Sequence, residues 1–216
     1  MPAAVKIEGL NLAYHWSDFT RIIFKDVELD LPVGSFATVT GSNGSGKSSL
    51  LRLILGLCVP QSGRISIHGN DVTAGSPATL KSLNAAYLPQ NPTDLFLGET
   101  VRQELLTAVD GNDQRVTRIA ADFALTRHLE QPIRHLSGGE RQRLGLASFF
   151  AQDRQLLFLD EPSSYLDYSS ASLLKDALQQ ASREGATILH VTQYDDEIKW
   201  GQIHFHIQDS GVTVRT

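Results

Sequence analysis

The stretch that decides the fold is residues 41–48, which read Gly41-Ser42-Asn43-Gly44-Ser45-Gly46-Lys47-Ser48. This run satisfies the pattern G-x-x-x-x-G-K-[ST] of a phosphate-binding loop. Its glycines let backbone N–H groups approach a phosphate chain, and the start of the following helix adds partial positive charge. Lys47 supplies a charge for the β- and γ-phosphates, and the Ser48 hydroxyl is placed for Mg²⁺. The run therefore predicts a nucleotide site, with a glycine-rich turn that binds nothing as the alternative.

The segments around this loop have the alternation that such a site requires. Residues 35–40 are expected to form a strand, and residues 48–57 have leucines at helical spacing. Further strands are expected at 5–7, 11–14, 24–31, 64–68, 85–88, 155–159, 185–191, 203–207 and 212–214, and further helices at 101–109, 116–125, 139–151 and 170–181. This order predicts an α/β fold with a mainly parallel sheet and a small antiparallel piece from the β-rich start.

Length and composition exclude several classes of protein. The chain has 216 residues, of which 41% are hydrophobic and 20% charged, so a disordered or collagen-like chain is excluded. A net charge of −5 argues against a strongly basic nucleic-acid binder. Cys58 is the only cysteine, which excludes an internal disulfide and fits a reducing compartment. No run of about 20 apolar residues predicts a membrane span, and residues 1–15 lack the pattern of a signal peptide.

A second candidate site follows the apolar run Leu156-Leu157-Phe158-Leu159, which ends in Asp160 and Glu161. The carboxyl end of a central parallel strand lies beside the phosphate loop in folds of this kind. Asp160 is predicted to hold Mg²⁺, directly or through water. Glu161 is predicted to orient or deprotonate the attacking water. A strand that simply runs out into solvent is the alternative, and the phosphate loop earlier in the chain favours the catalytic interpretation.

A third segment reads Leu136-Ser137-Gly138-Gly139-Glu140-Arg141-Gln142-Arg143. Together with the two sites above, it resembles the signature of ABC-type ATPases, over essentially the whole chain. Ser137 also has the position of a helix cap, with Glu140 three residues later. Other family marks follow in order: Tyr14 lies where the adenine-stacking aromatic does, Gln90 where the Q-loop glutamine does, and Ser164-Tyr165-Leu166-Asp167 resembles the D-loop.

The resemblance implies a single P-loop NTPase domain over residues 1–216, of the ABC nucleotide-binding type. Its RecA-like core and antiparallel β subdomain would occupy 1–90 and 151–216, and its helical subdomain 91–150. The resemblance implies ATP and Mg²⁺ as cofactors. It assigns nucleotide contacts to Tyr14, Gly41, Ser42, Asn43, Gly44, Ser45, Gly46, Lys47, Ser48, Ser49, Ser137, Gly138, Gly139, Glu140 and Asp167, Mg²⁺ contacts to Ser48, Gln90 and Asp160, and catalytic roles to Glu161, Gln90 and Gln193.

The expected partners also come from the resemblance. In the family, two ATPase chains pack head to tail, so that Ser137 and Gly139 of one chain close on the γ-phosphate held by the other. The segment from Leu88 to Glu104 resembles the Q-loop region of energy-coupling-factor importer ATPases, which energise the uptake of vitamins and transition metals. This implies integral membrane transporter subunits as partners, no nucleic acid, and a place at the cytoplasmic face of the cell membrane.

The sequence departs from the family pattern at Gln193, where the family carries a switch histidine. A glutamine can donate a hydrogen bond to the γ-phosphate, but it cannot carry positive charge or relay a proton. His190 is expected to face the opposite side of its strand and not to substitute. Two interpretations stay open: Gln193 serves adequately, or the chain pairs with a second ATPase that has a stronger site.

Three alternatives remain at this stage. The chain could be the ATPase of another ABC importer or exporter, a soluble ABC protein that acts on nucleic acid or ribosomes, or a catalytically silent subunit. Two weaker signals are given ordinary structural interpretations. His204 and His206 are expected to belong to a plain strand, and Asp195-Asp196-Glu197 to a solvated helix start.

Overall fold

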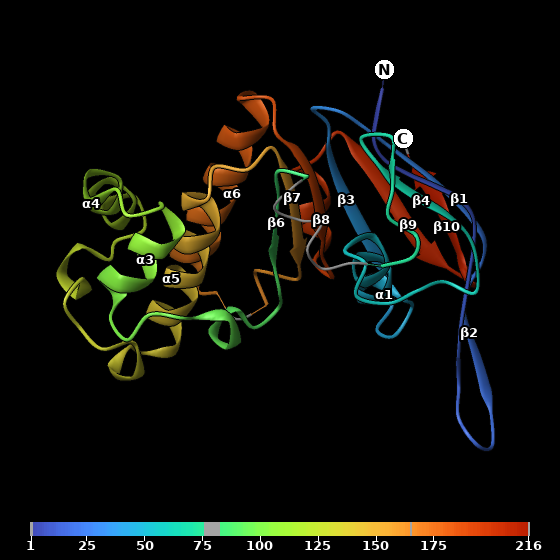
Figure 1. Ribbon diagram of the computed structural model, residues 1–216, viewed down its shortest axis with the longest axis horizontal. Helices are drawn as coiled ribbons and strands as arrows, with labels where there is room; N and C mark the ends of the chain where they lie inside the picture. The colour runs from blue at the N-terminus through green and yellow to red at the C-terminus, as the bar shows by residue number, and fades with distance from the viewer. Residues whose placement is uncertain (1, 76–82, 165, 216) are drawn as a thin grey trace.

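The structure is a computed structural model that describes residues 2–75, 83–164 and 166–215. Its strands form two sheets (Figure 1). The antiparallel sheet has the order β2 (Thr20–Pro32), β1 (Ala3–His15), β4 (Ser62–Ile67) and β5 (Asn70–Asp71). The second sheet has the order β10 (Gly211–Arg215), β9 (Ile203–Gln208), β3 (Phe36–Gly41), β8 (Thr187–Val191), β7 (Leu156–Asp160) and β6 (Ala85–Leu88). Its strands pair in parallel, except that β10 is antiparallel to β9.

Some of the helices pack directly on the second sheet, and others pack on those helices. The helices are α1 (Lys47–Ile54), α3 (Val101–Ala108), α4 (Asp113–Asp122), α5 (Gly138–Ala151), α6 (Tyr168–Arg183) and α7 (Asp195–Ile198), with short 3-10 turns at Pro92–Leu95, Thr126–His128 and Ile133–His135. In Figure 1, α3 to α6 gather at one end of the molecule, whereas α1 and the antiparallel sheet lie at the other. The hairpin of β1 and β2 projects beyond the body (Figure 1). Among the described residues, none of the helices has the length and apolar character needed to cross a membrane.

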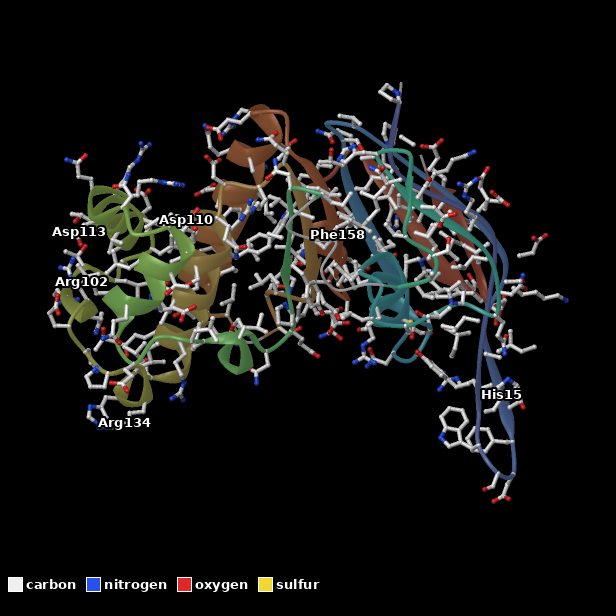
Figure 2. The ribbon with its side chains drawn as sticks, viewed as in Figure 1. His15, Arg102, Asp110, Asp113, Arg134 and Phe158 are labelled. Carbon is white, nitrogen blue, oxygen red and sulfur yellow. The ribbon has the colours of Figure 1, made fainter. Side chains whose placement is uncertain are left out.

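The central strands are apolar throughout because both of their faces are buried. Along β7, Leu156 and Phe158 join a core shared with α1 and the antiparallel sheet. The alternate residues Leu157 and Leu159 join a second core that includes α3, α4, α5 and α6. Figure 2 shows Phe158 between these two parts of the molecule. This strand therefore holds the helical end and the β-rich end together, and it carries Asp160 at its last position.

The predicted α/β fold with a parallel sheet and an antiparallel piece is what the structure contains. Several predicted boundaries were wrong: for example, β2 begins at Thr20 and not at residue 24, and α4 covers Asp113–Asp122 and not 116–125. The strands expected at 5–7 and 11–14 are one strand, β1, whose pairing with β2 is interrupted near Gly9, where φ is +59°. The helix after the phosphate loop ends at Ile54 because Gly56, with a φ of +67°, follows its cap. α3, α4 and all of α5 except its last residue, Ala151, fall within the range 91–150 predicted for the helical subdomain.

We expect Phe158→Ala to lower the free energy of unfolding by about 3–5 kcal/mol, because it opens a cavity between two cores. Leu97→Ala is the matched control, since that side chain is 83% exposed. The control should change stability by less than about 0.5 kcal/mol. Urea denaturation followed by circular dichroism measures both, and equal midpoints for the two variants would contradict the role given to β7.

Candidate functional site

The phosphate loop joins β3 to α1 through backbone that only glycine adopts easily. Gly44 has a φ of +76° and Gly46 a φ of +113°. A Cβ at Gly46 would lie 2.7 Å from Ile23 Cγ2, and one at Gly44 would lie 2.9 Å from Arg21 Nη2. The loop is therefore packed against β2, which fixes its shape. Gly46 precedes the first residue of α1, so the start of that helix faces the loop.

Lys47 is buried, and its ammonium group is held at the mouth of the loop. Its Nζ donates to the carbonyl oxygens of Gly41, at 2.9 Å, and Ser42, at 3.4 Å. The same Nζ lies 3.3 Å from Glu161 Oε1. A buried ammonium needs such partners because unpaired charge is costly to remove from water. Lys47 thus links the phosphate loop to the acidic end of β7.

Ser48 and Asp160, which are both predicted Mg²⁺ ligands, are in contact. The Ser48 hydroxyl donates to Asp160 Oδ1 at 3.1 Å. Burial raises the pKa of the Asp160 carboxyl, and the hydrogen bond from Ser48 opposes that rise. A hydroxyl and a carboxylate are the oxygen ligands that Mg²⁺ takes in nucleotide sites, together with phosphate oxygens and water. These residues therefore fit that ion.

Glu161 is in the left-handed region, with a φ of +47°. Non-glycine residues adopt this conformation at a cost, and such strain is typical of functional positions. The backbone N–H of Glu161 donates to Val191 O at 2.9 Å, which ties it to the end of β8. Its carboxylate accepts from Gln90 Nε2 at 3.4 Å. The predicted catalytic residues Glu161, Gln90 and Gln193 all line one cavity.

That cavity has a volume of about 460 Å³ and also contains the loop residues Asn43, Gly44, Gly46, Lys47, Ser48 and Ser49. Tyr14 also lines the cavity, and its hydroxyl lies 3.3 Å from Ser49 Oγ. Trp16 stands edge-on to Tyr14, with ring centroids 6.1 Å apart. Arg21 also lines the cavity and donates to Gly44 O at 2.6 Å. A cavity lined by aromatic side chains and by a phosphate-binding loop is what a nucleotide requires.

Several predicted site residues are not among the residues that line this cavity, including Gly41, Ser42, Ser45 and Asp160. Ser137, Gly138, Gly139 and Glu140 are not among its lining residues, nor is Asp167. Ser137 caps α5 in the predicted manner: its N–H donates to Glu140 Oε2 at 2.7 Å, and its Oγ accepts from Glu140 N at 3.3 Å. Asp167 caps α6 by accepting from Ser170 N at 2.7 Å. Tyr165, also quoted for this segment, lies outside the described residues.

Sequence reasoning missed several residues at the site. Arg21 and Ile23 come from β2, and only their alternation on a strand could have indicated a shared face. The prediction that Asp195-Asp196-Glu197 is a solvated helix start was wrong for Glu197, which is buried and accepts from Thr192 Oγ1 at 2.5 Å. α7 turns Glu197 inward against β8, whereas Asp195 and Asp196 are exposed.

The three histidines considered in the sequence analysis, His190, His204 and His206, lie in strands. His190 is fully buried in β8 and does not line the cavity, as expected from its place on the strand. His204 Nε2 and His206 Nδ1 lie 2.7 and 2.9 Å from Thr40 Oγ1, across β9 and β3. Within residues 2–75, 83–164 and 166–215, no group of three or more His, Cys, Asp or Glu side chains is arranged to hold a metal ion.

Comparison with known proteins shows the family to which this chain belongs. A sequence model described as ABC transporter matches residues 24–164. The chain belongs to the ABC transporter family. As such it is the ATP-binding subunit of an ABC transporter and an ATPase, and the predicted ABC-type fold is confirmed. The matched segment contains the phosphate loop, Ser137 and its helix, and Glu161.

Two curated relatives of this ABC protein are named for different kinds of transporter. The cytochrome c biogenesis ATP-binding export protein CcmA of Cupriavidus pinatubonensis is 38% identical over 176 residues, covering 80% of this chain and 77% of that protein. The energy-coupling factor transporter ATP-binding protein EcfA3 of Oenococcus oeni is 32% identical over 206 residues, covering 90% and 72%. Among solved structures, a dimeric post-hydrolysis ATP-binding cassette with ADP and Pi superposes with a TM-score of 0.85 at 21% identity, covering 98% of each chain. That likeness supports the fold.

We expect Tyr14→Ala to weaken ATP binding about tenfold, because stacking of a base on an aromatic ring is worth roughly 1–3 kcal/mol. Tyr14→Phe keeps the ring and loses only the contact with Ser49, so its affinity should stay within about threefold of the parent, since such a neutral hydrogen bond is worth little net. Nucleotide binding should also change Trp16 fluorescence, and Trp16→Phe should remove that signal. Equal affinities for Tyr14→Ala and Tyr14→Phe would contradict the base-stacking role.

Proposed function

We propose that this chain powers the import of a micronutrient, such as a vitamin or a transition-metal ion, through membrane subunits. In this proposal two ATPase chains dimerise around two MgATP at the cytoplasmic face of the cell membrane. The importer class is supported by the EcfA3 relative and by the resemblance of Leu88–Glu104 to energy-coupling-factor ATPases. The CcmA relative, named as an export protein, favours the second candidate, an exporter ATPase.

The observation that carries the proposed chemistry is the meeting of Lys47, Ser48, Gln90 and Glu161 in one nucleotide-sized cavity, with Asp160 hydrogen-bonded to Ser48 behind it. The triphosphate would lie against the backbone N–H groups of the loop, with its base beside Tyr14. Its negative charge competes with Glu161 for Lys47. Glu161 is then left to accept a proton from the attacking water, with Gln90 as its hydrogen-bond partner.

Gln193 and the Ser48–Asp160 pair complete this mechanism. The Gln193 amide donates a hydrogen bond toward the terminal phosphate, where negative charge grows during transfer. Ser48 and Asp160, with Gln90, would hold Mg²⁺, which supplies charge stabilisation between the phosphates. A neutral amide is a weaker donor than a charged group. The proposal therefore keeps both a dimer of two such chains and a pair with a second ATPase that has a stronger site.

We expect Glu161→Gln to lower ATP turnover by at least about 10²-fold, because it removes a general base. ATP binding should persist, since Lys47 and the loop are untouched. Glu184→Gln is the matched control, because Glu184 is exposed and outside the cavity. A steady-state phosphate-release assay and equilibrium binding measure the two quantities. Full ATP turnover in Glu161→Gln would contradict the proposed role of Glu161 as general base.

The transport assignment is tested by affinity purification of the tagged chain from detergent-solubilised native membranes, with mass spectrometry of the proteins that accompany it. We expect a polytopic membrane protein together with a small substrate-binding membrane subunit. A second, different ATPase in the same complex would assign Gln193 to one half of an asymmetric pair. Recovery of membrane subunits of an exporter would favour the second candidate, and recovery of ribosomes would overturn transport altogether.

A further inference from the structure

Gln193 lies at the apex of a short loop that is closed by hydrogen bonds from two buried side chains. Thr192 Oγ1 donates to Glu197 Oε2 at 2.5 Å and accepts from Tyr194 N at 3.0 Å. The N–H of Glu197 donates back to Tyr194 O at 3.1 Å. Residues 192, 194 and 197 thus form a closed hydrogen-bonded ring, and Gln193 projects from it into the nucleotide cavity.

This ring is anchored in the parallel sheet on both sides. The N–H of Thr192 donates to Val39 O at 3.0 Å, and so joins the ring to β3, the strand that leads into the phosphate loop. The residue before it, Val191, accepts from the N–H of Glu161 at 2.9 Å. Gln193, Glu161 and the phosphate loop are therefore positioned from one set of backbone contacts.

Glu197 is the least expected member of the ring, because it is a carboxylate that is only 6% exposed. Burial raises the pKa of its carboxyl, so its place here is costly unless it is hydrogen-bonded. Trp200 and His190 both lie next to Glu197, and the N–H of Trp200 donates to Glu197 O at 3.0 Å. Their rings stack with centroids 5.4 Å apart, and His190 Nε2 lies 3.3 Å from Glu197 Oε2.

His190 does not offset this cost as a cation. Complete burial lowers its pKa to about 3, so the imidazole is neutral at neutral pH. Among the described residues its ring nitrogens have no hydrogen-bond partner of good geometry, despite the short approach to Glu197. The Ser163 hydroxyl and Thr192 both interact with the Glu197 carboxylate and oppose the rise in its pKa. The hydrogen bond with Thr192 is the one that leads to Gln193, the next residue.

We propose that Glu197 is a positioning residue for ATP hydrolysis, which acts through Thr192 to hold Gln193 against the terminal phosphate. The inference rests on the proposed function of the site. Glu197 itself touches neither nucleotide nor water in this proposal. A shift of about 1 Å in a positioned group can cost about 10² in rate, so a carboxylate behind the loop can influence turnover without contributing chemistry.

The experiment compares Glu197→Leu, which removes the acceptor, with Glu197→Gln, which keeps a carbonyl acceptor for Thr192. Thr192→Val removes the donor while keeping the side-chain volume, and it tests the same contact should Glu197→Leu fail to fold. Asp196→Asn is the matched control, one position earlier on the same helix and exposed. Each change is made in the parent chain and in a Gln193→Ala background. Turnover, KM for ATP, nucleotide affinity and Tm are measured for all.

We expect Glu197→Leu and Thr192→Val to lower kcat roughly ten- to a hundredfold. The KM and the nucleotide affinity should change by less than about threefold, because Tyr14 and the loop that provide binding are intact. Glu197→Gln should recover most of the lost turnover, and Asp196→Asn should match the parent. In the Gln193→Ala background, the changes at 197 and 192 should have no further effect on kcat, since the group they position is gone.

Three results would overturn the inference: unchanged kcat in both Glu197→Leu and Thr192→Val, an equal further loss of kcat in the Gln193→Ala background, or a loss of kcat that follows Tm alone across all variants. Failure of the proposed function is distinguishable from these. If Glu161→Gln also leaves turnover unchanged, then the site itself is not the source of hydrolysis. If Glu161→Gln abolishes turnover while the variants at 197 and 192 keep it, then only the positioning role is wrong.

Discussion

The hydrogen bond from Ser48 to Asp160 joins the two segments on which the site depends. Ser48 belongs to the helix that follows β3, and Asp160 is the last residue of β7. These strands are not neighbours, because β8 lies between them in the sheet. The bond therefore depends on the pairing of β3, β8 and β7 in register, so the geometry of the site depends on the sheet.

The same arrangement explains why the polar groups gather where they do. Parallel strands place their carboxyl ends at one edge, and β3, β7 and β8 end in the phosphate loop, in Asp160 and in the segment that leads to Gln193. Their apolar interiors pack on both faces, which makes the strands rigid supports. The Lys47 side chain then connects the loop to Glu161, so that the positive ammonium lies within ion-pair distance of the negative carboxylate.

Much of this could be predicted from the sequence because the decisive signals are local. The glycine-rich run, the apolar strand ending in Asp160 and Glu161, and the Ser137–Glu140 cap each lie within a few consecutive residues. Glu197 could not be placed in the same way. Beside Asp195 and Asp196 it has the composition of a solvated helix start, and its burial depends on how α7 packs against β3 and β8.

The left-handed backbone of Glu161 and the contact of Arg21 with Gly44 were equally beyond local reasoning. The first depends on the hydrogen bond from its N–H to Val191 O, and the second on how β2 crosses the phosphate loop. Both are contacts between segments far apart in the sequence, and neither segment contains a local pattern that predicts the contact. Residues at sites of function often break local rules in this way, because the surrounding fold compensates for their cost.

The positions of Ser137 and Asp167 bear on how the proposed dimer would work. The exposed start of α5 presents Ser137 and two glycines at the positive end of a helix, away from the cavity that holds Lys47. In the proposed head-to-tail pair, that helix start would meet the phosphates bound by the other chain. ATP would then contact both chains only in the closed state, and would stabilise that state by its differential affinity. Hydrolysis would remove the contact that spans the interface, and the stored difference in affinity would become available to move the membrane subunits.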